Sequence, residues 1–170
     1  MLTGGHIAVS YLLAQTAKSF GLPLTGNEVL GIVIAGNIID LDFFAGFITG
    51  KTGEAHHQNI THTPLGITAI WMVTNLLFHP SIGLSLLLLT AMSLHLIMDE
   101  VGYWAYKLKL YKAVVFPQIN WLYPITGFHK HKLMKSNKNV LNYYLFKTWP
   151  ISLTELVLIV VASVIFFLSK

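Results

Sequence analysis

His95 and Asp99 have side chains and a spacing that suit metal binding. They stand four positions apart in the segment His95-Leu96-Ile97-Met98-Asp99. In a helix this spacing puts both side chains on one face, a turn apart. Imidazole nitrogen and carboxylate oxygen are common zinc ligands. Alone, the pair is more typical of a buried Asp–His contact that joins helices, so the other polar residues decide between the two interpretations.

Further histidines and aspartates are scattered along the chain. Asp40 and Asp42 offer two carboxylates at a predicted helix end, and we expect one to bind metal while the other orients a ligand or acts as a base. His57 and His62 belong to a polar loop, and His6 follows two glycines that permit close backbone approach. Asp42 is the candidate general base. The candidate metal ligands are His6, Asp40, Asp42, His57 (or its neighbour His56), His62, His95 and Asp99.

The composition is that of a membrane protein. Hydrophobic residues make up 54% of the 170 residues and charged residues only 11%, against roughly 25% charged in a soluble domain. The chain has no cysteine, so any metal must use histidine nitrogen and carboxylate oxygen, a set that suits zinc or another divalent ion. The number of ligands would supply one to three ions, and paired ions can hold a phosphoryl group and activate water.

Apolar segments separated by Gly and Pro predict an all-α membrane bundle of about five helices. We expect the whole chain, residues 1–170, to form one domain. The last helix is the clearest spanning segment and is predicted to be a C-terminal anchor, with Glu155 at the membrane interface or beside a lysine. The expected helices cover residues 6–20, 28–47, 65–78, 82–104 and 151–168.

Alternating membrane crossings would bring the candidate ligands to one side. The N-terminal histidine, the ends of the second and fourth helices and the loop before the third all fall on the side that holds the N-terminus. Lys18 and Lys170 fall on the other side, which leaves nine of the eleven lysines with the site. The positive-inside rule then predicts a multi-pass protein of the inner (cytoplasmic) membrane, with the site and the lysine-rich loop facing the cytoplasm.

The lysines also indicate a partner. A basic segment with two histidines, His129 to Lys138, lies beside apolar and aromatic residues. This setting favours anionic membrane lipids over nucleic acid. The segment could also capture an anionic headgroup or phosphate beside the metal.

The ordered set of motifs resembles a bacterial and archaeal family of membrane-bound metal-dependent hydrolases, the YdjM-like, LexA-regulated inner-membrane proteins. The family pattern is an early His, a Pro-Asp-x-Asp helix end, a His-Arg-Gly-x-Thr-His-Ser loop, a His-x-x-x-Asp helix and a later aromatic-Pro. The matching core covers roughly residues 4–127. Ile39, Gln58, Asn59 and Thr63 depart from the pattern. The matching segments are His6, Ile39 to Asp42, His57 to Thr63, His95 to Asp99 and Tyr123-Pro124.

The order of ligands is also similar to that of zinc-dependent phospholipase C and P1-type nucleases, all-helical enzymes that cleave phosphoesters. That resemblance implies one ion held by His6 with Asp40 or Asp42, and another held by His57 or His62 with His95 and Asp99. Their further His-x-x-x-Glu helix is missing, and His129 and His131 are possible substitutes.

We therefore expect a membrane-bound, zinc-dependent hydrolase that acts on a phosphoester, either a small molecule or a lipid or lipid-linked phosphate. The alternatives are a metal-ion transporter component, a non-catalytic membrane scaffold with a structural metal site, and a bis-His haem protein. A transporter would need polar residues that continue through the bilayer. A haem protein would need paired histidines inside the spans.

Overall fold

The described part of the chain in this computed structural model comprises residues 3–42, 59–110, 119–126 and 149–169. Within these ranges the regular structure is five α-helices and two short 3₁₀ turns, with no strand, so the all-α prediction is confirmed. The elements are α1 (Thr3–Ser19), α2 (Gly26–Ala35), η1 (Ile38–Asp40), η3 (Ile60–His62), α4 (Pro64–Phe78), α5 (Ile82–Lys107) and α7 (Trp149–Leu168).

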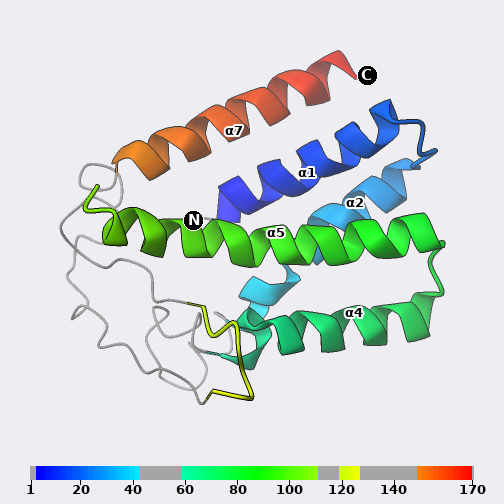
Figure 1. Ribbon diagram of the computed structural model, residues 1–170. Helices are drawn as coiled ribbons and strands as arrows, with labels where there is room; N and C mark the ends of the chain where they lie inside the picture. The colour runs from blue at the N-terminus through cyan, green and yellow to red at the C-terminus, as the bar shows by residue number, and fades with distance from the viewer. Residues whose placement is uncertain (1–2, 43–58, 111–118, 127–148, 170) are drawn as a thin grey trace.

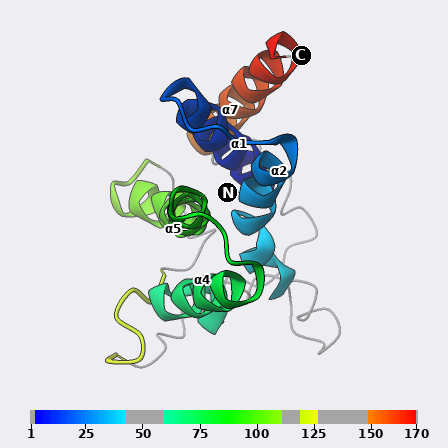
Figure 2. The same ribbon diagram turned by 90° about the vertical axis from the view of Figure 1, so that its right-hand side faces the viewer.

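The helices run side by side and alternate in direction along the chain (Figure 1). Helix α5 is central: it packs against α1 and α2 on one side and against α4 on another, and α7 packs against α1. Viewed along the helices in Figure 2, α7 and α4 lie at opposite ends of the stack. This alternation brings the start of α1, the turn after α2 and the start of α4 together beside α5.

Local signals explain where the helices begin and end. The Thr25 hydroxyl accepts from the Glu28 N–H while the Glu28 side chain accepts from the Thr25 N–H, a capping box that starts α2. The Thr63 hydroxyl caps α4 by accepting from the Gly66 N–H, and Pro64 occupies the first turn as expected. His79 ends α4 in the left-handed conformation, with φ of 45°, which agrees with its expected position in a turn.

The second predicted helix is wrong in its length. The sequence predicts that it reaches residue 47, but α2 ends at Ala35 and the 3₁₀ turn η1 follows; residues 43–47 lie outside the described part. A Cβ at Gly36 would lie 2.0 Å from the Ser10 Oγ atom of α1, so a larger residue there would require Ser10 to move. The Gly36 carbonyl accepts a hydrogen bond from His95 of α5. Contacts with two other helices, which the local sequence does not reveal, therefore mark the end of α2.

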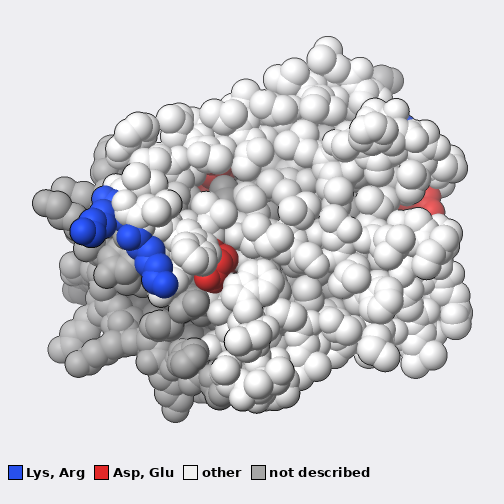
Figure 3. All heavy atoms as spheres, viewed as in Figure 1, with Lys and Arg blue, Asp and Glu red and all other residues white. Residues whose placement is uncertain are grey.

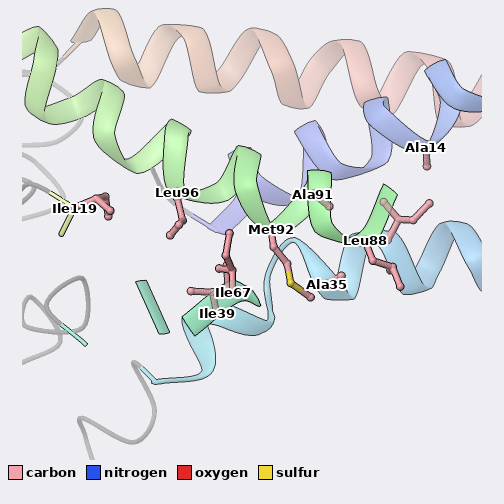
Figure 4. Close-up of a cluster of buried hydrophobic side chains, with 10 residues drawn as sticks. Ala14, Ala35, Ile39, Ile67, Leu88, Ala91, Met92, Leu96 and Ile119 are labelled. Carbon is pink, nitrogen blue, oxygen red and sulfur yellow. The ribbon is translucent and has the colours of Figure 1, made fainter. Parts of the chain in front are cut away.

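The apolar core lies directly beside the candidate ligands (Figure 4). Ile39 of η1, Ile67 of α4, and Met92 and Leu96 of α5 are all buried. Since residues three or four apart share a helix face, Met92 and Leu96 lie on the side of α5 that also carries His95 and Asp99. Close packing around the ligands restricts the rotamers that they can adopt.

The surface of the described bundle is largely apolar. Large side chains such as Leu76 of α4 and Phe167 of α7 are more than 70% exposed. Figure 3 shows a face that is mostly uncharged, with lysine atoms gathered at the end where α5 finishes. Two of the described helices, Ile82–Ala105 and Trp149–Leu168, are long and apolar enough to cross a membrane. An apolar exterior of this kind is suited to lipid.

Helix α7 packs along α1, and an acidic residue lies in this contact. The sequence predicts Glu155 at the membrane interface or beside a lysine; its side chain is only 4% exposed and accepts a hydrogen bond at the start of α1. The glycines at the start of α1 let α7 approach closely there.

Candidate metal centre

Five of the predicted ligands lie together in the middle of the bundle. Ligand atoms of His6, Asp40 and His95 lie within 4.8 Å of one another, and so do those of a second group, His62, His95 and Asp99. All except Asp40 are at most 2% exposed. They come from the first turn of α1 (His6), the last residue of η1 (Asp40), the last residue of η3 (His62) and the middle of α5 (His95 and Asp99).

The orientation of the His95 ring is fixed by the backbone. Its Nδ1 atom lies 2.7 Å from the Gly36 carbonyl oxygen, which can only accept, so Nδ1 carries the proton. In the neutral ring, Nε2 then presents its lone pair to the centre of the cluster. One oxygen of Asp40 and one of Asp99 each lie 3.3 Å from Nε2. A lone pair facing two carboxylates is repulsive unless a cation lies between them or Nε2 also carries a proton.

Four distances within the cluster are close to the ligand–ligand distances of a zinc site. Zinc bound at about 2.0–2.1 Å to each ligand would separate neighbouring ligand atoms by about 3.3–3.5 Å. The His95 Nε2 atom lies 3.3 Å from each carboxylate. The His62 Nε2 atom lies 3.5 Å from Asp40 Oδ1 and 3.8 Å from Asp99 Oδ2. Each of the two histidines thus lies near both carboxylates, so these residues could share an ion.

Asp42 lies on the opposite side of the His62 ring. Its Oδ2 atom is 3.1 Å from His62 Nδ1 and also accepts hydrogen bonds from the Asn59 amide and the Thr61 hydroxyl. Asp40 and Asp42 thus approach the two different nitrogens of one imidazole, in line with the expectation that they take different roles. A carboxylate on the outer nitrogen of a histidine ligand fixes its tautomer and makes it a stronger ligand.

The same contacts control the charges of the loop residues. Burial alone would raise the pKa of Asp40, but hydrogen bonds with His62 and His95 outweigh it and hold that pKa far below its usual value. Burial likewise opposes ionisation of Asp42, whose contacts with His62, Thr61 and Asn59 lower its pKa overall. Burial would lower the pKa of His62, but its hydrogen bonds with Asp40 and Asp42 raise it. The cluster thus places two ionised carboxylates where a cation is favoured.

His6 completes the cluster from the side of α1. Its Nε2 atom lies 3.1 Å from Asp99 Oδ1, the oxygen that does not face His95. Its ring stacks on the His95 ring, with centroids 3.8 Å apart and planes 21° apart. His6 therefore contacts two ligands at once, and it can either orient Asp99 or contribute a further nitrogen to the ion.

The two ligand groups cannot each hold an ion through His95. Both ligand groups contain His95, yet Nδ1 of this residue is engaged by Gly36. Only Nε2 can bind metal, and one nitrogen lone pair serves one ion. The other predicted donors, His57 with its alternative His56, and His129 and His131, lie outside the described residues.

Several groups that orient the candidate ligands are not apparent from the sequence pattern. The Gly36 carbonyl and the Asn59 and Thr61 side chains orient ligands, although the pattern gives no reason to assign these roles. Asn59 and Thr61 stand three and one positions before His62, and this proximity is the only signal. Glu100 is 5% exposed and accepts from the Ile119 N–H at 2.7 Å. It ties the segment 119–126 to α5.

Fold and site together define an all-helical membrane protein with a buried His/Asp cluster that could bind a metal ion. The chain belongs to the YdjM inner membrane protein family, whose family model matches residues 1–170, the whole chain. Searches of curated proteins and of solved structures gave no match. The similarity to phospholipase C and P1-type nucleases therefore stays a prediction.

Proposed function

We propose that this protein is a membrane-embedded, zinc-dependent hydrolase of phosphoesters. The observation that carries the proposal is the position of His95 Nε2, 3.3 Å from two carboxylate oxygens while Nδ1 is held by a backbone carbonyl. In our proposal His62, His95, Asp40 and Asp99 hold the ion, His6 supports Asp99, and Asp42 orients His62. When bound, the zinc would polarise a phosphoryl oxygen and lower the pKa of a water.

Access at Asp40 favours a catalytic role. Its side chain is 18% exposed, whereas those of His62, His95 and Asp99 are at most 1% exposed. Of the four proposed ligands only Asp40 is partly exposed, so water and substrate could reach the ion from its side. A catalytic zinc site needs such access for water or substrate.

The depth of the site favours a lipid or lipid-linked substrate. His95 lies twelve residues before the end of α5 at Lys107, or roughly 18 Å along the helix. It therefore falls inside the candidate span Ile82–Ala105. A phosphoester carried by a lipid could reach this depth from within the bilayer more easily than a soluble one.

Metal analysis and an activity screen test the proposal. We expect the detergent-purified protein to contain one equivalent of zinc per chain and to hydrolyse a member of a phosphodiester and lipid-phosphate panel. Chelation should abolish the activity and added zinc should restore it. If the purified protein contains no stoichiometric metal, the proposal is refuted, because the proposed mechanism assigns the activation of water to zinc alone.

A structural metal site is the second candidate. Four protein ligands that close a tetrahedral shell are typical of structural zinc, and His62 and His95 each lie within 3.8 Å of both carboxylates here. In this case chelation would lower the thermal stability of the protein, and the same substrate panel would give no hydrolysis.

A further inference from the structure

Helix α7 carries one ionisable residue between Trp149 and Leu168, and that residue is buried. Glu155 is 4% exposed and is one of three buried residues of the helix, with Ile151 and Ala162. An acidic group inside an apolar membrane helix costs at least a few kcal/mol, so its presence points to a function. A helix that served only as an anchor would have no need of it.

One partner of Glu155 is the start of α1. Its Oε1 atom accepts a hydrogen bond of 2.9 Å from the Gly5 N–H. Since α1 begins at Thr3, this N–H is among the first four of the helix, which have no partner within it. A carboxylate at this position also interacts favourably with the helix dipole.

Glycine makes the contact possible. A Cβ at Gly4 would lie 3.1 Å from the Ile159 side chain and 3.9 Å from Glu155 Oε1. The backbone of α1 therefore approaches α7 closely at Gly4 and Gly5, as the sequence suggests. The next residue is His6, so the turn that Glu155 holds is the turn from which His6 projects.

We infer that Glu155 is a positioning residue of the metal centre, which fixes the first turn of α1 so that His6 keeps its contacts with Asp99 and His95. These contacts are a 3.1 Å approach to Asp99 and a stacked ring on His95. Helix α7 thus supports the metal centre in addition to serving as a C-terminal anchor. The inference rests on the proposed metal site.

Zinc affinity of the full-length protein in detergent, measured by chelator competition, is the first test. Loss of a residue that supports ligands lowers metal affinity about 10- to 100-fold, and we expect about tenfold for Glu155→Ala. Glu155→Gln should stay close to the wild-type affinity, because its amide oxygen can accept the same hydrogen bond. Leu156→Ala, at the adjacent and 57% exposed position, is the matched control and should change nothing.

A double-variant comparison separates positioning from general loss of structure. If Glu155 acts through His6, Glu155→Ala should lower zinc affinity in the wild-type background but add nothing to His6→Ala. An equal loss in both backgrounds, or wild-type affinity in Glu155→Ala, would overturn the inference.

A second measurement needs no metal. His6 is 2% exposed, so modification by diethyl pyrocarbonate, followed by mass spectrometry, should be slow in the wild type and in Glu155→Gln. It should be severalfold faster in Glu155→Ala, and an unchanged rate would contradict the inference. If the wild type binds no zinc yet shows this difference, the proposed function fails while the role of Glu155 in placing His6 stands.

Discussion

The imidazole of His95 connects the backbone of α2 to the centre of the site. Gly36 fixes which nitrogen carries the proton, and the other nitrogen faces Asp40 and Asp99. The same distances would suit a doubly protonated imidazolium that bridges the carboxylates. In one state the neutral His95 binds a metal ion, and in the other a second proton on Nε2 bridges the carboxylates. The metal content of the purified protein distinguishes these two states.

The first prediction concerns the two ligands on α5. His95→Ala or Asp99→Ala should remove stoichiometric zinc and any hydrolytic activity, because each deletes one corner of the proposed shell. Elemental analysis of the purified variants measures this. Ile97→Ala, on the same helix with its side chain 47% exposed, is the control and should keep its zinc. Full activity in either ligand variant would refute the role of that residue.

The second prediction separates two roles for Asp42, which the sequence suggests as ligand and general base. Its contact with His62 Nδ1 instead favours an orienting role. Asp42→Asn should then lower zinc affinity about 10- to 100-fold, yet keep substantial activity once zinc is saturating. Activity that stays lost at saturating zinc would identify Asp42 as the base.

The sequence predicts which residues meet but not how they pair. Alternating helices bring His6, Asp40, His62 and Asp99 to one region, and apolar periodicity is enough to infer that alternation. Asp40 lies at one nitrogen of His62 and Asp42 at the other, and this pairing depends on the conformation of the turn η1. Backbone dihedrals of a short turn are decided by contacts from elsewhere in the fold, so spacing alone does not determine them.

At the scale of elements, helix boundaries are predictable where helix-breaking residues stand next to them in the sequence. The third and fifth predicted helices, 65–78 and 151–168, match α4 and α7 within two residues, because Pro64, the His79-Pro80 turn and Pro150 mark their ends. The end of α2 has only Gly36 as a local signal, and its real causes are Ser10 and His95 on other helices. Tertiary contact overrides the apolar pattern there.

The third prediction tests this junction. In Gly36→Ala the new methyl group would overlap Ser10 Oγ, at 2.0 Å, and overpacking of this kind costs about 1–3 kcal/mol of stability. The shift should also disturb the His95 hydrogen bond and weaken zinc binding. Thermal unfolding in detergent and chelator competition measure the two effects.

Gly31→Ala is the matched control for that variant. Gly31 lies within α2, and a Cβ added there would meet no atom within 4 Å outside its own helix backbone and chain neighbours. Replacing a helical glycine by alanine stabilises by roughly 0.5–1 kcal/mol. Adding Ser10→Ala to Gly36→Ala should recover part of the loss. If Gly36→Ala is as stable as Gly31→Ala, the close approach of α1 and α2 is not required.

At the scale of the whole molecule, the site depends on several helices and no single one suffices. The ligands come from α1, η1, η3 and α5, and α7 touches the start of α1. Assembly of the centre therefore requires the complete bundle. Zinc binding should accordingly report on the folded state of the entire described bundle, since a ligand that binds only the native state stabilises it.

The orientation of the bundle gives the last prediction. We propose that the end of α5 faces the cytoplasm, because lysines concentrate in the segments next to it. The chain has no cysteine, so single cysteines can be placed at Lys18, at the end of α1, and at Lys109, just beyond α5. A membrane-impermeant thiol reagent applied to intact spheroplasts should label Lys18→Cys and leave Lys109→Cys unlabelled. Permeabilised membranes, in which both should react, control for accessibility, and the reverse pattern in intact cells would place the lysine-rich end outside and overturn the orientation.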